Sequence, residues 1–253
     1  MKLALVTAGF HRLGAAIAAR LAENGWTLAL HGRKPETPDA ALAAVLALHK
    51  TQWHGFAADL SDAATVQHLI PSVEAHFGKA PDLLVNNASR FDWDDAGSVT
   101  PDALSAHFGV NAAAPVTLAT AMASHVAGGD TACVINILDQ RIRHPGGDQL
   151  SYTISKLALF GATETLARAL APKVRVNAVA PGLVIPTEDY LPSQMEALRA
   201  AMPLGRLPEP DDVADAVLWL AGAEVVTGQT IFVDAGAALK SFDRDFLFLG
   251  RDD

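Results

Sequence analysis

The sequence predicts an α/β fold: a mostly parallel, doubly wound sheet of about seven strands with helices on both faces. Short apolar runs alternate along the chain with longer segments whose apolar residues recur every three or four positions, so strands and helices follow one another. The chain has 253 residues and no break in composition. It is therefore expected to form one domain over residues 1–253 with a large core, ending in a tail over 241–253.

The charge and cysteine content exclude several classes of function. The formal net charge is −9 and no run of Lys or Arg exceeds two residues, so neither a nucleic-acid surface nor a nucleic-acid partner is expected. No apolar run is long enough for a membrane span, and the scattered histidines suggest no metal site. Cys133 is the only cysteine, and the apolar stretch at the N-terminus is too short for a signal peptide, so a cytoplasmic location is expected.

The first strand, 2–6, breaks into a glycine-containing turn that leads to a helix over 12–24. A strand, a turn and a helix N-terminus form the dinucleotide site of Rossmann-like folds, because the helix end offers N–H groups and a positive dipole to pyrophosphate. Ala8 replaces the first glycine of the usual pattern, and a purely structural turn is the alternative. The residues expected to contact the cofactor here are Thr7, Gly9, His11, Arg12, Leu13 and Gly14.

Gly25 ends that helix, and a second strand is expected over 26–31. An acid at the end of this strand suits a ribose 2′-hydroxyl, whereas a basic residue suits a 2′-phosphate. The sequence has His31, Arg33 and Lys34 here, which favours NADP(H) over NAD(H). The alternative is a solvated basic loop.

A helix over 39–50 leads to a third strand over 52–57, followed by Asp59, Leu60 and Ser61. Asp59 lies where a carboxylate could accept a hydrogen bond from the adenine amino group. Ser61 is expected to be the N-cap of the next helix, 62–77.

The fourth strand, 82–85, ends in Asn86-Asn87-Ala88-Ser89. Ligands of such sheets bind beyond the strand ends, and small or amide side chains let a cofactor lie against the backbone there. Phe91 and Trp93 follow in an acidic loop. They are expected either to stack on a planar ligand or to anchor the loop onto the core.

A helix over 101–126 contains Asn111, which needs a hydrogen-bonding partner if it is buried. The fifth strand, 131–138, ends at Asp139, and a long helix through residue 170 carries Tyr152 and Lys156. Four residues apart on a helix, these two side chains point the same way. The ammonium group favours the tyrosinate and would lower the pKa of Tyr152, which suits proton transfer.

The last third of the chain continues the alternation. A sixth strand over 174–179 leads to Pro181 and Gly182, and the segment 183–207 is the expected substrate lid. A helix over 211–221 and a seventh strand over 229–234 complete the alternating β/α chain.

In this order the features resemble those of the short-chain dehydrogenase/reductases over nearly the whole chain. The resemblance rests on the glycine turn at 7–14, Asp59, the run 86–89, Asn111, Tyr152 with Lys156, and Pro181 with Gly182. It implies cofactor binding along the strand ends, by residues that include Leu60, Asn87, Ala88, Ser89, Pro181 and Gly182.

The same resemblance implies the roles of the catalytic residues. Tyr152 would donate the proton, Lys156 would hold the nicotinamide ribose and tune Tyr152, and Asn111 would support Lys156 through water. Most members carry a serine where this sequence has Asp139. An ionised carboxylate cannot donate to a carbonyl and would repel a developing alkoxide, but it keeps the phenol protonated. Such a site suits reduction of a C=N bond.

Asp139 is shared with the pteridine reductase branch, including dihydromonapterin reductases, which the sequence resembles more closely still. In that branch the aromatic matching Phe91 stacks on the pterin, and the residues matching Arg12 and Ser89 contact the ring and the cofactor phosphate. The substrate expected is therefore a pterin or folate, contacted by Arg12, Ser89, Phe91, Asp139 and Tyr152.

Two other functions remain open: a carbonyl reductase, such as a 3-oxoacyl thioester reductase, and a catalytically idle NADP-binding protein. The side chain of the natural substrate and the direction of the reaction also remain open. The tail has three phenylalanines, Phe242, Phe246 and Phe248, among charged residues. We expect it to dock on a neighbouring subunit, since the family resemblance implies homotetramers.

Overall fold

The structure is a computed structural model that describes residues 1–186, 190–242 and 244–249. In this part of the chain, seven parallel strands form one sheet in the order β3-β2-β1-β4-β5-β6-β7. The strands are β1 (Leu3–Thr7), β2 (Thr27–Gly32), β3 (Trp53–Ala57), β4 (Leu83–Asn86), β5 (Ala132–Ile137), β6 (Val174–Pro181) and β7 (Thr230–Val233). The predicted fold class is confirmed, and each predicted strand end lies within about two residues of the observed one.

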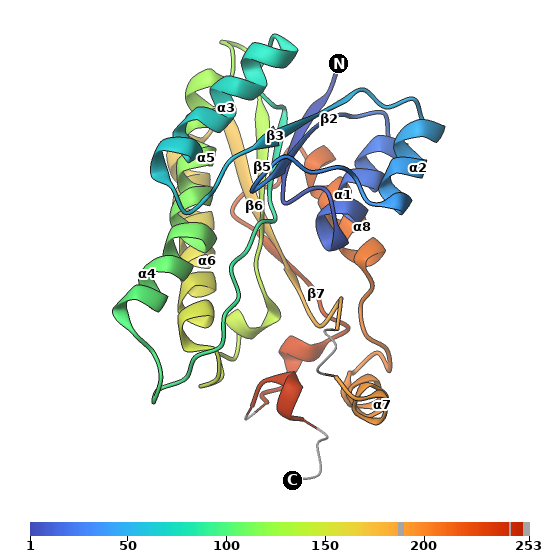
Figure 1. The fold of residues 1–253 in the computed structure, drawn as a ribbon, viewed down its shortest axis with the longest axis vertical. Helices are drawn as coiled ribbons and strands as arrows, with labels where there is room; N and C mark the ends of the chain where they lie inside the picture. Colours follow the sequence, from blue (N-terminus) through green and yellow to red (C-terminus); the bar gives the residue numbers. More distant parts are fainter. Residues whose placement is uncertain (187–189, 243, 250–253) are drawn as a thin grey trace.

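Helices cover both faces of the sheet (Figure 1). One face carries α1 (Arg12–Glu23), α2 (Ala40–Leu48) and α8 (Pro210–Gly222), and the other carries α3 (Ala63–Phe77), α5 (Ala114–His125) and α6 (Leu150–Leu170). Alternate side chains of each strand serve opposite layers: Val6 packs in the first layer and Leu5 in the second. The central strands are therefore buried on both sides.

The helix predicted over 101–126 is interrupted. It consists of α4 (Pro101–Phe108), a π-helical turn over Gly109–Ala113 and α5. Pro115 lies four residues after Asn111, and in a regular α-helix its ring would clash with the Asn111 carbonyl. A wider turn relieves this clash, and such turns often occur at functional sites.

The helix after β3 starts one residue later than predicted. The side chain of Asp62 accepts from the N–H of Ala64 at 3.0 Å and is the N-cap of α3, so the prediction that Ser61 caps this helix is wrong. The Ser61 hydroxyl instead donates to Asp59 Oδ1 at 2.7 Å. The short Asp59-Ser61 turn therefore uses the hydroxyl that the sequence pattern assigned to the helix.

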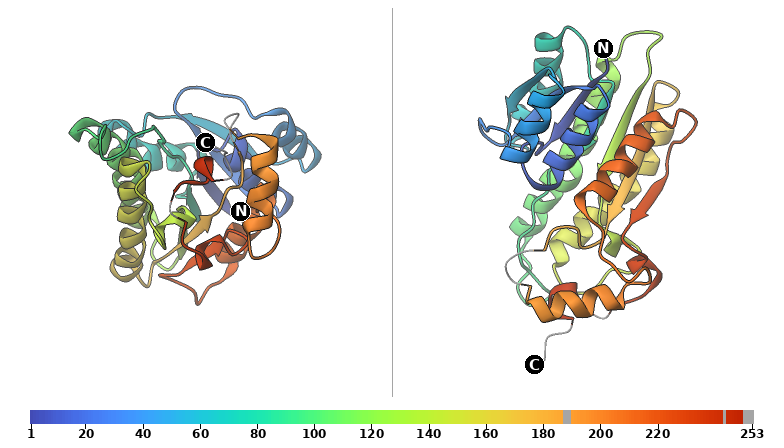
Figure 2. Two further views of the ribbon diagram at one scale, coloured as in Figure 1. Left: turned by 90° about the horizontal axis from the view of Figure 1, so that it is seen from below. Right: turned by 90° about the vertical axis from the view of Figure 1, so that its right-hand side faces the viewer.

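The carboxyl ends of the strands meet a layer made by the loop after β5 and by the last third of the chain. Here lie α7 (Pro192–Ala201) and short 3₁₀ turns at Gln140–Ile142, Ala237–Leu239 and Phe246–Phe248 (Figures 1 and 2). This layer includes most of the predicted lid, of which residues 187–189 lie outside the described part. In the described part, no helix is both long and apolar enough to cross a bilayer.

The tail folds back onto its own chain. Phe246 is buried with Leu198, Met202 and Ala237, and the amide nitrogen of Gln194 donates to the carbonyls of residues 246, 247 and 249 at 2.7–3.0 Å. The described residues of the tail, 241–242 and 244–249, thus pack on their own chain, and a contact of the tail with a neighbouring subunit stays a prediction. The apolar side chains of the tail cover the chain's own lid segment.

Candidate active site

A cleft of about 780 Å³ opens at the carboxyl ends of the strands, where the sheet order reverses between β1 and β4. Ligands of doubly wound sheets bind at this kind of switch point. The predicted site residues that line the cleft are His11, Arg12, Leu13, Gly14, Arg33, Asn87, Ser89, Phe91, Asp139, Tyr152, Lys156, Pro181 and Gly182. The predicted residues that do not line it are Thr7, Gly9, His31, Asp59, Leu60, Ala88 and Asn111.

The glycine turn packs too closely for larger side chains. A Cβ on Gly14 would lie 1.9 Å from the carbonyl oxygen of Ala8, and one on Gly9 would lie 2.8 Å from that of Val6. Ala8 has φ of 49°, the left-handed conformation in which glycine is less costly. The turn therefore keeps the backbone shape of a glycine-rich loop although Ala8 replaces its first glycine.

Thr7 joins this turn to the next strand rather than facing the cleft. Its buried hydroxyl donates to the Val85 carbonyl and accepts from the N–H groups of Asn87 and Ala88, both at 2.9 Å. The Asn87 amide returns a hydrogen bond to the Thr7 carbonyl at 3.0 Å. These contacts fix the floor of the cleft between β1 and β4, which explains why the sequence places small polar residues here.

The end of β2 differs from the prediction at one residue. His31 is buried, its Nδ1 accepts from the N–H of Ala8 at 3.3 Å, and its Nε2 lies 2.9 Å from the Ala58 carbonyl. Burial lowers the pKa of this imidazole, which stays neutral and uses both nitrogens in the fold. His31 therefore braces the turn, and a direct contact with a phosphate is contradicted.

Arg33 lines the cleft, together with an acid that the sequence reasoning left aside. Glu36 lies so close to Gly32 that a Cβ there would meet its Oε1 at 2.8 Å, and its other oxygen is 3.2 Å from His11 Nε2. Beside the end of β2, the cleft thus presents the Arg33 guanidinium and the Glu36 carboxylate, which His11 holds.

Asp59 lies just outside the cleft. Its carboxylate accepts from the backbone N–H of Ser61 at 2.9 Å and from the Ser61 hydroxyl. These hydrogen bonds hold the pKa of Asp59 below its ordinary value, so the group is anionic at neutral pH.

Asn111 is buried and has the hydrogen-bonding partners that the sequence argument required. Its amide nitrogen donates to the Arg90 carbonyl and to the Ser155 hydroxyl, both at 2.9 Å, and its oxygen accepts from the Arg90 N–H at 2.7 Å and from the Ser89 hydroxyl at 3.3 Å. It therefore ties the loop after β4 to α6, one residue before Lys156.

The Tyr152 hydroxyl donates to Asp139 Oδ2 at 3.0 Å. Burial is the largest cause that raises the pKa of Tyr152 well above its ordinary value, and the negative charge of Asp139 is the second. The phenol is therefore protonated at neutral pH. The predicted effect of Asp139 on Tyr152 agrees with this direction, whereas the net lowering of the pKa expected from Lys156 is wrong, because burial and Asp139 dominate.

Lys156 lies one helical turn after Tyr152 and is 2% exposed. Its ammonium donates to the Ile137 carbonyl at 2.8 Å and lies 5.6 Å from the centre of the Tyr152 ring. Burial lowers the pKa of Lys156 to about 8, and the Asp139 carboxylate partly opposes this shift. Lysine, tyrosine and aspartate thus meet at the mouth of β5, as the sequence predicted.

Phe91 and Trp93 form an exposed aromatic edge of the cleft. Phe91 meets the Tyr152 ring edge to face, with centroids 4.8 Å apart, and Trp93 contacts both Phe91 and Phe248 of the tail. About half of each side chain remains exposed, so both can contact a ligand. The two aromatics thus anchor their loop to α6 and to the tail, and stacking on a planar ligand stays a prediction.

Sequence reasoning missed four residues that support this site. Arg141 binds Asp139, Gln149 begins α6 and accepts from Arg141, Asp94 accepts from the Ser151 N–H at 3.0 Å, and Asp245 reaches the cleft from the tail. Asp94 was one of three aspartates in a loop, and Asp245 lies 106 positions after Asp139. The only sequence signal for these ion pairs is the mixture of Asp and Arg residues in the tail.

Comparison with known proteins identifies the family. The family profile described as enoyl-(acyl carrier protein) reductase matches residues 9–238, which is most of the chain. The chain belongs to the short-chain dehydrogenase/reductase family. Members of this family are oxidoreductases, so the resemblance found in the sequence is confirmed.

Individual members of the family point to more than one substrate. Pteridine reductase 1 of Leishmania tarentolae is 33% identical over 279 residues, covering 94% of this chain and 96% of the relative. The 3alpha-hydroxysteroid dehydrogenase of Mediterraneibacter gnavus is 36% identical over 250 residues, covering 93% and 96%. The crystal structure of FolM alternative dihydrofolate reductase 1 from Brucella canis, complexed with NADP, has a TM-score of 0.84 and 34% identity, covering 94% and 95%. This short-chain dehydrogenase/reductase is thus similar to pteridine reductases and to enzymes of other substrates.

Proposed function

We propose that the protein is an NADPH-dependent reductase of a pteridine ring, of the dihydropterin or dihydrofolate type. The observation that carries the proposal is the hydrogen bond from the Tyr152 hydroxyl to Asp139. The serine usual at this position could donate to a carbonyl oxygen, whereas the Asp139 carboxylate is occupied as an acceptor. A substrate atom that receives a proton and needs no second donor, such as a ring nitrogen, suits this arrangement.

Each polar side chain has a distinct part in this proposal. NADPH supplies a hydride when bound. Tyr152, kept protonated by burial and by Asp139, delivers the proton to the substrate nitrogen. Asp139 accepts from the phenol hydroxyl until this hydroxyl turns to the substrate nitrogen, and the transfer leaves a tyrosinate. Lys156, held by the Ile137 carbonyl, presents its remaining N–H groups toward the cleft that it lines. Phe91 packs edge to face against the phenol ring.

The cofactor end of the cleft fits a dinucleotide with a 2′-phosphate. Gly14 lets the backbone of the turn approach a pyrophosphate, and the N-terminus of α1 supplies unpaired N–H groups. Arg33 is the cleft-lining cation at the end of β2. The FolM neighbour complexed with NADP supports this choice.

Arg33→Ala should weaken NADPH binding about 10-fold to more than 100-fold, because a charge-assisted hydrogen bond contributes about 1.5 to 3 kcal/mol. NADH, which lacks the phosphate, should lose little affinity. Titrating the quenching of intrinsic fluorescence with each cofactor measures both constants. Lys34→Ala is the matched control, since Lys34 is exposed and does not line the cleft. Equal losses for NADPH and NADH would mean that Arg33 does not bind the phosphate.

The alternative substrate is a ketone, and the similarity to a hydroxysteroid dehydrogenase favours it. An assay of NADPH oxidation with dihydropterins, dihydrofolate, keto-thioesters and ketosteroids decides between them. Turnover of a pterin or folate at least tenfold faster than of any ketone supports the proposal. A preference for ketones would contradict it, and inactivity with every class would leave the idle cofactor-binding function.

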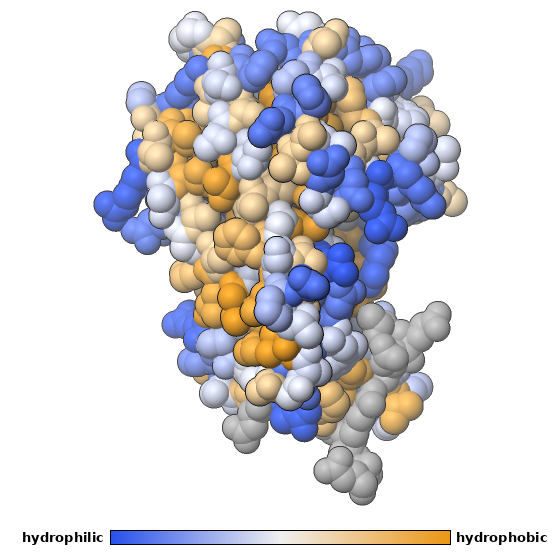
Figure 3. Space-filling view, turned by 60° about the vertical axis from the view of Figure 1, so that its left-hand side comes forward, coloured by the Kyte–Doolittle hydropathy of each residue, from blue (hydrophilic) through white to orange (hydrophobic). Residues whose placement is uncertain are grey.

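We further propose that the enzyme is a cytoplasmic homotetramer. Exposed apolar side chains gather on the face that includes α4 and α6, where Phe108, Ile154 and Phe160 are each more than 40% exposed (Figure 3). A contiguous apolar face of this kind usually marks a protein contact. Light scattering should give a mass near four times 26.5 kDa at micromolar concentration, and a monomeric mass would contradict the proposal.

A further inference from the structure

The loop after β5 and the tail of the same chain meet through a chain of ion pairs next to Tyr152. Arg141 donates from Nε to Asp139 Oδ1 at 3.2 Å, and from Nη2 to Asp245 Oδ2 at 2.7 Å. Its Nη1 donates to the side chain of Gln149, the residue that precedes α6. The three charged side chains are between 10% and 20% exposed, so solvent screens their interactions only weakly.

Arg141 holds one carboxylate oxygen of Asp139 and leaves the other for Tyr152. Asp139 Oδ1 accepts from both the backbone N–H and the guanidinium of Arg141, and this leaves Oδ2 for the Tyr152 hydroxyl. The Arg141 guanidinium carbon lies 5.1 Å from the centre of the Tyr152 ring, so it also packs against the phenol. The direction of the Asp139–Tyr152 hydrogen bond therefore depends on where Arg141 is held.

We propose that Arg141 is a positioning residue for Asp139, and that Asp245, supplied by the tail, holds Arg141 in place. This inference rests on the proposed part of Asp139 beside Tyr152. If so, the tail contributes to the active site of its own chain through Arg141. In the described hydrogen bonds, Asp245 contacts Arg141 and not the Tyr152 hydroxyl.

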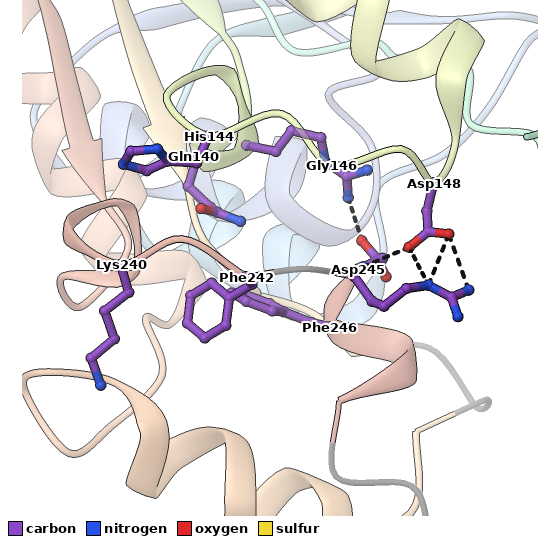
Figure 4. A pocket seen from close by; sticks show the side chains of 10 residues that line it. Gln140, His144, Gly146, Asp148, Lys240, Phe242, Asp245 and Phe246 are labelled. Carbon is purple, nitrogen blue, oxygen red and sulfur yellow. Dashed lines mark hydrogen bonds and ion pairs between the residues drawn. The ribbon is translucent and has the colours of Figure 1, made fainter. Parts of the chain in front are cut away.

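A second ion pair of the tail provides a control. Arg244 pairs with Asp148 at 3.0 Å, and Asp148 also accepts from the Asp245 N–H at 2.9 Å (Figure 4). This pair stabilises the docked tail but does not include Arg141. The tail is also held by the three hydrogen bonds from Gln194 and by buried Phe246, so it should stay docked when either ion pair is removed.

The charged and titratable groups around Arg141 come from three parts of the chain. They are Asp139 after β5, Tyr152 and Lys156 on α6, Asp148 before α6, and Arg244 and Asp245 in the tail. Burial lowers the pKa of Arg141, but Asp139, Tyr152 and Asp245 outweigh it and raise that pKa, so Arg141 carries its charge at every pH of an assay. A change of activity in Asp245 variants therefore does not come from the ionisation of Arg141. The charge of Asp245 also raises the pKa of Tyr152, and the double variant separates this direct effect from one that acts through Arg141.

The experiment compares kcat and KM for Asp245→Asn, Asp245→Glu, Arg141→Gln, Arg244→Gln and the double variant Arg141→Gln/Asp245→Asn. The substrate is whichever compound the wild-type enzyme reduces, so the result does not depend on its being a pterin. Asp245→Asn should lower kcat about tenfold, the size typical of residues that orient a reacting group, with the KM for NADPH unchanged. Asp245→Glu should recover much of the loss, and Arg244→Gln should stay within about twofold of wild type.

The double variant distinguishes positioning from other effects of the tail. If Asp245 acts through Arg141, Arg141→Gln/Asp245→Asn should be no slower than Arg141→Gln alone. Multiplied losses in the double variant would overturn the proposal, as would equal losses in Asp245→Asn and Arg244→Gln. A rise of kcat in Asp245→Asn would also overturn it, because the tail would then obstruct the cleft. Unfolding midpoints of all variants confirm that the fold is kept.

Discussion

Tyr152→Phe is expected to lower turnover by about 100- to 10,000-fold, the range contributed by a general acid. The phenylalanine ring keeps the edge-to-face packing against Phe91 and the position over the start of α6, so only the hydroxyl is lost. The remaining carboxylate of Asp139 is an acceptor, not a donor, when ionised. Asp139, which accepts from the phenol hydroxyl, therefore cannot replace the proton that Tyr152 delivers.

Rates of NADPH oxidation with a saturating substrate, together with a direct titration of NADPH, check this expectation. The affinity for NADPH should change little, because the hydroxyl is bonded to Asp139 and the lysine that lines the cleft keeps its bond to Ile137. A variant that retains more than a tenth of wild-type turnover would show that the proton comes from elsewhere. Loss of NADPH affinity in step with turnover would instead assign Tyr152 to binding.

The sequence predicts the sheet well because the signals are local. Apolar runs and the helices between them specify each strand to within about two residues, and parallel strands joined by helices can form few topologies. The meeting of Asp139, Tyr152 and Lys156 also follows, because the carboxyl end of β5 and the start of α6 are close in the chain. The exact start of a helix is harder to predict. Ser61 and Asp62 are both favourable N-cap residues, and the sequence does not tell which one caps α3.

Contacts between residues that lie far apart in the sequence cannot be predicted from local sequence patterns. His31 is a plausible phosphate ligand until one sees that Ala8 and Ala58 occupy both nitrogens, and nothing near it in the sequence reveals those partners. The tail is similar, because three phenylalanines indicate that it packs but not against what. Its partners Gln194 and Arg141 lie about 50 and 100 positions earlier. Only the three-dimensional structure identifies the partners of His31 and of the tail.

Asp139→Ser is expected to lower pterin reduction about 10-fold to more than 100-fold while NADPH affinity is kept. The change removes a charged acceptor from the Tyr152 hydroxyl, a hydrogen bond of about 1.5 to 3 kcal/mol, and also removes one of the two carboxylate partners of the Arg141 guanidinium. It restores the hydroxyl with which other members of the family bind a carbonyl oxygen. Any ketone activity should therefore rise as the pterin activity falls.

The pH profile gives an independent measure of the same substitution. The Asp139 carboxylate raises the pKa of Tyr152, so its removal must lower that pKa. An acid with a lower pKa loses its proton sooner as the pH increases, so the decline of kcat at alkaline pH should begin at a lower pH in Asp139→Ser than in wild type. Asp139→Asn is the matched control, because it removes the charge without supplying the hydroxyl: it should share the shift of the profile but gain no ketone activity. If Asp139→Ser instead reduces keto-thioesters faster than wild type and wild type reduces no dihydropterin or dihydrofolate, then the enzyme is a carbonyl reductase.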